Sequence, residues 1–115
     1  MPLPENDRVR LQHMLDAGEQ ALLFCAGKSR ADLDSDVMLR FALVHAITVV
    51  GEAAAKISTQ TRGALPDIPW DSIVGMRNRL VHAYFDIDSE VLWESVNKGL
   101  PPLAAQLRAV LRPTV

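Results

Sequence analysis

The side chains best suited to chemistry gather in one short segment, GMRNRLVHAYF (75–85). Within eight residues it carries two arginines, an asparagine, a histidine and the chain's only tyrosine: Arg77, Asn78, Arg79, His82 and Tyr84. Histidine exchanges protons near neutral pH and can act as a general base or acid. Arginine holds a phosphate through paired N–H donors and stabilises the charge of a pentacoordinate transition state. The segment therefore has the side chains that cleavage of a phosphodiester needs.

RNA suits this set of residues, because its 2′-hydroxyl is an internal nucleophile and the reaction then requires no metal. The nearby acidic residues Asp86, Asp88 and Glu90 lie in a region typical of a helix cap and not in a cluster of metal ligands. We therefore expect no metal site and no cofactor.

Helical geometry limits which of these side chains can cooperate. His82 shares a helix face with Asn78, four residues before it, and adjoins Arg79, three residues before it. Arg77 is five residues from His82, which separates the two by about 140° around the helix axis. Arg77 and His82 converge only if the helix unwinds near His82, or if they come from different subunits. Arg77 and Tyr84 share a face if the helix lasts that long.

The rest of the sequence predicts helices that position this segment. Apolar residues recur at helical spacing from about 7 to 26, with Asn6 or Asp7 as the cap and Gly27 at the stop. A polar connection (28–34) follows, and Asp34 or Ser35 caps a second helix that should end near 58–62. Gly51 in that helix predicts a close crossing with a neighbouring helix.

The second half follows the same pattern. A loop (63–69) precedes a third helix that starts at Pro69 and ends near 82–84. A fourth helix starts at Val91 and is interrupted at Pro101-Pro102, after which a final segment reaches Leu111. No longer strand-like alternation is found. The prediction is an all-α, antiparallel four-helix-type bundle that forms a single domain over residues 1–115.

Composition bounds the class of protein. The 115 residues are 49% hydrophobic and only 5% aromatic, which favours a packed helical domain. The net charge of −2 gives no global basic field, so any contact with nucleic acid must use a local patch, mostly of arginine. The single cysteine, Cys25, cannot form an internal disulfide.

The N-terminus does not resemble a signal peptide, and the most apolar stretch (41–50) is shorter than the roughly 20 residues of a membrane span. We expect a cytoplasmic protein with no membrane partner.

The signature Arg77-Asn78-x-x-x-His82-x-Tyr84 resembles the R-x(4–6)-H motif of HEPN-domain ribonucleases, and more closely the R-x(4)-H-x-Y signature of the HepT-like toxin branch. Three flanking blocks occur in that family's order: VVGEAAAKIS (49–58), LPDIPWDSIVGMRNRLVHAYFDID (65–88) and VLWESVNKGLPPL (91–103). The likeness covers most of residues 7–112. The short motif occurs by chance in many chains, and the flanking blocks make the likeness specific.

The resemblance implies a HEPN-like fold that forms a homodimer, with two copies of the motif facing each other across a cleft. It implies metal-independent cleavage of RNA, with tRNA or mRNA as target, by Arg77 and His82, which Asn78 and Arg79 support. It also implies a toxin–antitoxin system. The partner would be an MntA-like nucleotidyltransferase antitoxin that transfers AMP to Tyr84.

Each residue also has a structural interpretation. His82 could cap its helix, Arg77 could pair with Asp71 or lie in an interface, and Asn78 could orient the imidazole or only cap. Arg79 could be structural or contact the RNA backbone, and Tyr84 could sit at the edge of the core. Glu52 could pair with an arginine of the third helix or could simply be exposed to solvent. His45 is expected in the core or in an interface. The alternative functions are a non-catalytic helical module that regulates a nucleotidyltransferase, and a purely structural dimer.

Overall fold

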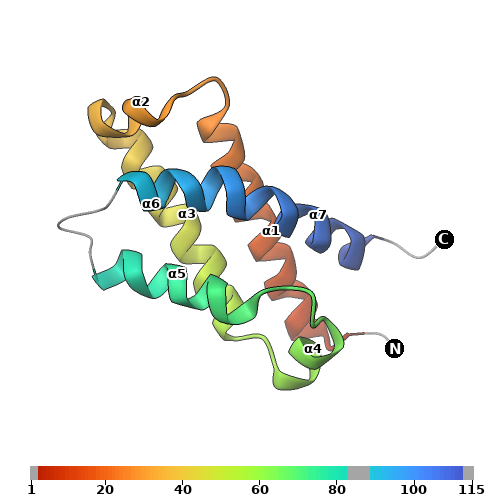
Figure 1. Ribbon diagram of the computed structural model, residues 1–115. Helices are drawn as coiled ribbons and strands as arrows, with labels where there is room; N and C mark the ends of the chain where they lie inside the picture. The colour runs from red at the N-terminus through yellow and green to blue at the C-terminus, as the bar shows by residue number, and fades with distance from the viewer. Residues whose placement is uncertain (1–2, 83–88, 113–115) are drawn as a thin grey trace.

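The computed structural model describes residues 3–82 and 89–112, and at residues 81 and 82 it describes the backbone alone. Within these ranges the chain is all-helical, as predicted, with no strand. The elements are α1 (Glu5–Cys25), α2 (Arg30–Ser35), α3 (Val37–Ala55), α4 (Thr59–Ala64), α5 (Trp70–His82), α6 (Ser89–Glu94), the π-helical turn η1 (Ser95–Gly99) and α7 (Leu100–Leu111). Figure 1 shows α1 and α3 side by side, with α5 against α3 and the α6–α7 rod passing across them.

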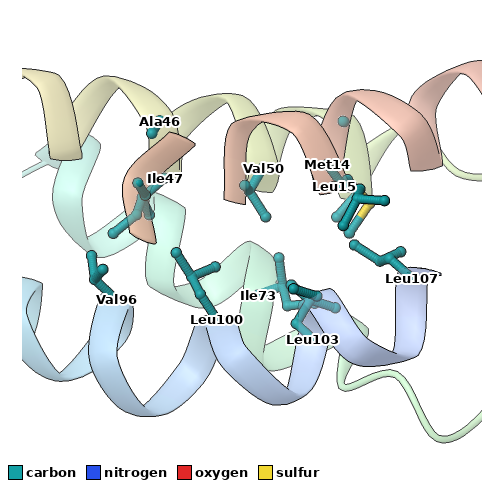
Figure 2. Close-up of a cluster of buried hydrophobic side chains, with 14 of the residues drawn as sticks. Met14, Leu15, Ala46, Ile47, Val50, Ile73, Val96, Leu100, Leu103 and Leu107 are labelled. Atoms are coloured by element: carbon teal, nitrogen blue, oxygen red, sulfur yellow. The ribbon is translucent and has the colours of Figure 1, made fainter. Parts of the chain in front are cut away.

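The core forms where the apolar faces of α1, α3, α5 and α7 meet. In α1 the predicted stripe is buried from Leu11 to Cys25 in steps of three and four residues. Met14, Val50, Ile73 and Leu107 come from four different helices and belong to the same buried cluster, part of which Figure 2 shows. Burial of this apolar surface is the main favourable term that holds the helices together.

The connection predicted at 28–34 is wrong in part, because α2 forms there. Ser29 and Asp32 make a capping box: the Ser29 backbone N–H donates to the Asp32 carboxylate at 2.7 Å. The residue that caps α3 is Asp36, whose Oδ1 accepts from the Leu39 N–H at 3.0 Å, and not Asp34 or Ser35. A six-residue helix is too short for apolar periodicity to detect.

The second predicted helix also ends earlier than expected. It stops at Ala55, and after a short break Ser58 caps a separate helix, α4, by accepting from the Thr61 N–H at 3.2 Å. The Ser58 hydroxyl therefore caps the start of α4, in the region where the sequence predicts the end of the second helix.

Asp7 does not cap α1, contrary to the prediction; the capping position is Pro4, and no side chain caps the helix. The Asp7 carboxylate is 2% exposed and accepts three hydrogen bonds from the start of α4. The donors are the Ser58 N–H (3.1 Å), the Ser58 hydroxyl (2.6 Å) and the Thr61 hydroxyl (2.5 Å). Asp7 thus joins the first turn of α1 to a segment about fifty residues away.

The C-terminal rod is irregular one turn before its prolines. The Leu100 N–H donates to the Ser95 carbonyl, a π-type bond that defines η1. Pro101 and Pro102 then lie in the first turn of α7, where the missing N–H groups cost least. The interruption predicted at the prolines is therefore a widened turn that lets the rod continue, and it starts at Ser95.

One face of α3 is left uncovered. The molecule measures 46 × 29 × 19 Å, and its smallest dimension is about two helix diameters. Of the apolar band predicted for this helix, Val37, Met38 and Phe41 are 52%, 83% and 63% exposed. His45 is exposed on the same side, so its predicted place in the core is wrong, and its alternative place in an interface stays a prediction.

By length and composition α3 could cross a membrane, because its 19 residues have a mean hydropathy of 1.6; 39% of that segment is buried inside the protein. The apolar segment is therefore longer than the ten residues picked out from the sequence. A core helix of a soluble protein meets the same criterion, and α3 packs against both α1 and α5.

Asp7→Asn is expected to lower the free energy of unfolding at pH 7 by about 1–3 kcal/mol, because buried donors lose an anionic acceptor. Hydrogen bonds from Ser58 and Thr61 hold the pKa of the Asp7 carboxyl below its usual value of 3.8. Its contribution is therefore complete above the unfolded-state pKa and is lost as pH falls through the lower folded-state pKa. Urea titrations at pH 7 and pH 3 test this, with the exposed Asp16→Asn as control. Equal losses in the two variants at pH 7 would contradict it.

Candidate functional site

Apolar residues on one side of α5 pack against the rest of the protein and so set the position of this helix. The helix starts directly after Pro69, as predicted, and Trp70 anchors its first turn: the indole is buried and its Nε1–H donates to the Leu65 carbonyl at 3.1 Å. Ile73 and Leu80 are also buried. Arg77 lies four residues after the first and three before the second, so it belongs to the same face of α5. An arginine on this packing face needs space on the opposite helix.

Gly51 of α3 provides that space. A Cβ atom added at Gly51 would lie 2.1 Å from the Arg77 Cβ and 2.6 Å from its Cγ, far inside van der Waals contact. The close crossing predicted from this glycine is confirmed, and its partner is the base of the arginine side chain. Because α3 has no side chain at this point, the stem of Arg77 passes over the helix and its guanidinium reaches the surface.

Two neighbours orient the Arg77 guanidinium. Nη2 donates to Glu52 Oε1 at 3.3 Å, and Nη1 donates to Asn78 Oδ1 at 2.8 Å. The side chains of Arg77 and Glu52 are 31% and 51% exposed, and ion pairs that are so open to solvent add little to stability. The two contacts therefore fix the direction of the arginine more than they hold the fold together.

The guanidinium keeps donors for a ligand. Each Nη nitrogen carries a second N–H besides the one already used. The side chain is partly exposed, so a ligand can approach the guanidinium, whereas its Nε is buried and has no hydrogen-bond partner in the described part of the chain. Such an arrangement suits an anion, and a phosphate in particular.

The sequence interpretations of this region have different outcomes. Arg77 pairs with Glu52, so the suggestion that it pairs with Asp71 is wrong, whereas the suggestion that Glu52 finds an arginine of this helix is correct. Glu52 is exposed as well. Asn78 contacts Arg77; its predicted contact with His82 stays a prediction. Arg79 is exposed and takes part in no hydrogen bond or ion pair between described side chains.

His82 is the last residue of α5, and the backbone is helical up to and including it. The helix therefore does not unwind between Arg77 and His82, and the two positions keep their separation of about 140° around the axis. Unwinding of α5 between the two residues is therefore excluded, and their convergence from different subunits stays a prediction. Tyr84 lies outside the described residues, so its predicted relation to Arg77 stays a prediction.

Metal-ligating side chains do not gather anywhere in the described ranges: no group of three or more histidine, cysteine, aspartate or glutamate residues could hold an ion there. Cys25 is buried, as its place on the apolar stripe of α1 predicts, and burial raises the pKa of its thiol.

Comparison with known proteins gives the family. The sequence model of the HepT-like ribonuclease family matches residues 14–110 of this chain. The chain belongs to the HepT-like ribonuclease family. The matched range contains α3, α5 and all five of the candidate site residues, and ribonuclease activity in general is what this membership supports.

Three relatives illustrate the likeness, and two of them match almost end to end. A protein of Caldanaerobacter subterraneus subsp. tengcongensis, provisionally named an RNase, is 31% identical over 105 residues, which are 91% of this chain and 94% of the relative. A protein of Methanocaldococcus jannaschii with a similar provisional name is 30% identical over 100 residues, 87% of this chain and 92% of the relative. One from Thermococcus cleftensis, provisionally named ribonuclease HepT, is 38% identical over 72 residues, 63% of this chain and 66% of the relative. No solved structure matches this HepT-like chain at a significant level.

The crossing of α3 and α5 makes a direct prediction. Gly51→Ala is expected to destabilise the protein by about 1–3 kcal/mol, because the new methyl group overlaps the Arg77 stem and forces the helices apart. Gly75→Ala in α5 is the matched control: nothing lies within 4 Å of its added Cβ, so it should stabilise by about 0.5–1 kcal/mol. Thermal unfolding of both variants measures the difference. A neutral or stabilising Gly51→Ala would contradict the close crossing.

Proposed function

We propose that this HepT-like chain is a metal-independent endoribonuclease and the toxin of a toxin–antitoxin pair. The observation that carries the proposal is the oriented, partly exposed guanidinium of Arg77, five residues before a histidine on an intact helix in a ribonuclease family. Here the nucleophile is the substrate's own 2′-hydroxyl, so the chain needs to supply a proton carrier and a stabiliser of phosphate charge.

The reaction assigns one role to each residue. His82 takes the proton of the 2′-hydroxyl while that oxygen attacks the neighbouring phosphorus. The bond from phosphorus to the 5′-oxygen breaks, and His82 returns the proton to the leaving 5′-oxygen. Arg77 donates to the phosphate oxygens as negative charge builds on them. The products are a 2′,3′-cyclic phosphate and a 5′-hydroxyl, and no atom or charge remains unaccounted for.

The active form in this proposal is a homodimer with composite sites. The separation of Arg77 and His82 on one helix supports a site that takes Arg77 from one subunit and His82 from the other. The uncovered face of α3, with Val37, Met38 and Phe41, supplies the apolar surface that a second copy would cover. Because α5 packs beside α3, dimerisation through this face brings both α5 helices to the same interface.

Purified protein should cleave RNA in the presence of EDTA, and His82→Ala and Arg77→Ala should each lower the rate by about 100-fold or more. Denaturing gels and end-group analysis for the cyclic phosphate measure this. Arg108→Ala, which removes an exposed arginine paired with Glu19, is the control and should cleave at the wild-type rate. Equal cleavage by His82→Ala would sink the assignment, and RNA binding without products would favour the non-catalytic module.

A mixture of the two inactive variants tests the composite site. Random exchange makes half of the dimers mixed, each with one intact site of two, so activity should return to about a quarter of the wild-type level. If both residues acted within one chain, mixing would restore nothing. Phe41→Glu should yield an inactive monomer by light scattering, because a charge replaces the apolar contact.

Regulation in this proposal comes from an MntA-like nucleotidyltransferase antitoxin that transfers AMP from ATP to the Tyr84 hydroxyl and releases pyrophosphate. The attached phosphodiester is an anion near a site built to bind one, so it would occupy the Arg77 donors and exclude substrate. Co-expression should add the mass of AMP to the wild type but not to Tyr84→Phe, and should abolish cleavage only in the wild type. Inhibition of an unshifted wild-type mass would mean neutralisation by binding alone.

A further inference from the structure

A groove of about 400 Å³ runs between α1 and α3 on the surface beside the Arg77 site. Its lining combines apolar side chains, among them Val9 and Val49, with polar and charged ones. Arg10 and His13 contribute from α1, and Glu52 and Lys56 contribute from α3. Neither Arg77 nor His82 lines this groove, and the proposed mechanism does not use it.

Neither cation of the groove, Arg10 or Lys56, forms an ion pair between described residues. Arg10 Nη1 donates to the backbone carbonyl of Lys56 at 3.1 Å, which ties the two helices but leaves the charge of Arg10 without a carboxylate partner in the described part of the chain. Lys56 is exposed at the C-terminal end of α3 and takes part in no ion pair between described residues. Asp7, three residues before Arg10, interacts with it through charge, but the Asp7 carboxylate is buried and accepts its hydrogen bonds from α4.

The groove is continuous with the candidate site through one residue. Glu52 lines the groove, and its Oε1 contacts Arg77 Nη2 at 3.3 Å. This carboxylate is paired with Arg77, and the groove has two cations, Arg10 and Lys56, for one carboxylate. Lys56 lies one helical turn beyond Glu52, about 6 Å along α3. A chain molecule that places one phosphate on Arg77 can thus extend over Glu52 onto Lys56 and Arg10.

We propose that this groove binds the RNA strand next to the scissile phosphate, with Arg10 and Lys56 on backbone phosphates and His13 as an additional hydrogen-bond donor. The apolar strip of Val9 and Val49 faces the riboses and bases, as expected of a surface that follows a single strand. This inference rests on the proposed ribonuclease function and deepens it. It also explains how a chain with net charge −2 holds a polyanion: the positive charge is local.

The test is binding of a fluorescent, fully 2′-O-methylated RNA, which lacks the attacking hydroxyl and stays intact. The double variant Arg10→Gln/Lys56→Gln should weaken the Kd by tenfold or more at low salt. The slope of log Kd against log salt should become shallower by about 0.7 for each lost phosphate contact. Lys28→Gln/Lys98→Gln is the matched control: it also removes two positive charges, both from exposed positions that do not line the groove, and it should bind as the wild type does. Circular dichroism melts establish that each variant is folded.

The outcomes separate this inference from the function beneath it. If the double variant binds RNA as the wild type does, and the wild type cleaves RNA, the groove is not the RNA-binding site and the proposed ribonuclease function is unaffected. An equal loss in Lys28→Gln/Lys98→Gln also overturns the inference, since the effect would then come from net charge and not from the groove. A double variant that binds RNA normally but no longer binds the nucleotidyltransferase assigns the groove to a protein partner instead. A wild type that neither binds nor cleaves RNA refutes both proposals.

Discussion

The close contact of α3 with α5 at Gly51 is the constraint on which the rest of the site depends. The glycine leaves no side chain between the helices, so the stem of Arg77 fills that space and its guanidinium emerges beside Glu52 and Asn78. Trp70, Ile73 and Leu80 hold α5 in this register from either side. A larger residue at position 51 would move the helix, and with it every group at its C-terminal end. Packing and chemistry are therefore coupled at one point.

The thinness of the molecule connects the separate surface features. With a depth of about two helices, the chain cannot cover both sides of α3, and its outward face keeps Val37, Met38 and Phe41 in solvent. The Arg77–Glu52 pair and the groove with Arg10 and Lys56 lie toward the other end of the same helix. One helix thus carries an apolar half suited to a second copy and a polar half suited to an anionic strand. In our proposal the dimer and the substrate share α3 without competing for it.

The predictions from sequence failed for two kinds of feature: helices too short to show a periodic pattern, and contacts between residues far apart in the sequence. The helices α2 and α4 have six residues each, too few for a periodic pattern, and their capping residues Ser29 and Ser58 are common in loops as well. Asn6 and Asp7 are typical capping residues, but no side chain caps α1, and the partners of Asp7 are Ser58 and Thr61, far along the chain. The apolar neighbours of His45 predict a buried place, but periodicity does not show which side of a helix the rest of the chain covers, and a place in an interface stays a prediction.

The sequence alone determined the helical class, the main helices, the close crossing at Gly51 and the family, because repeating apolar positions, a glycine within a helix and a specific motif with its flanking blocks are all local patterns. Tertiary structure decided which acidic residue holds Arg77, that α5 remains helical through His82, that half of the apolar band on α3 is uncovered, and that Arg10 and Lys56 line a groove next to Glu52. Each of these depends on the relative placement of helices remote in sequence, which burial of the shared core fixes and no local pattern encodes.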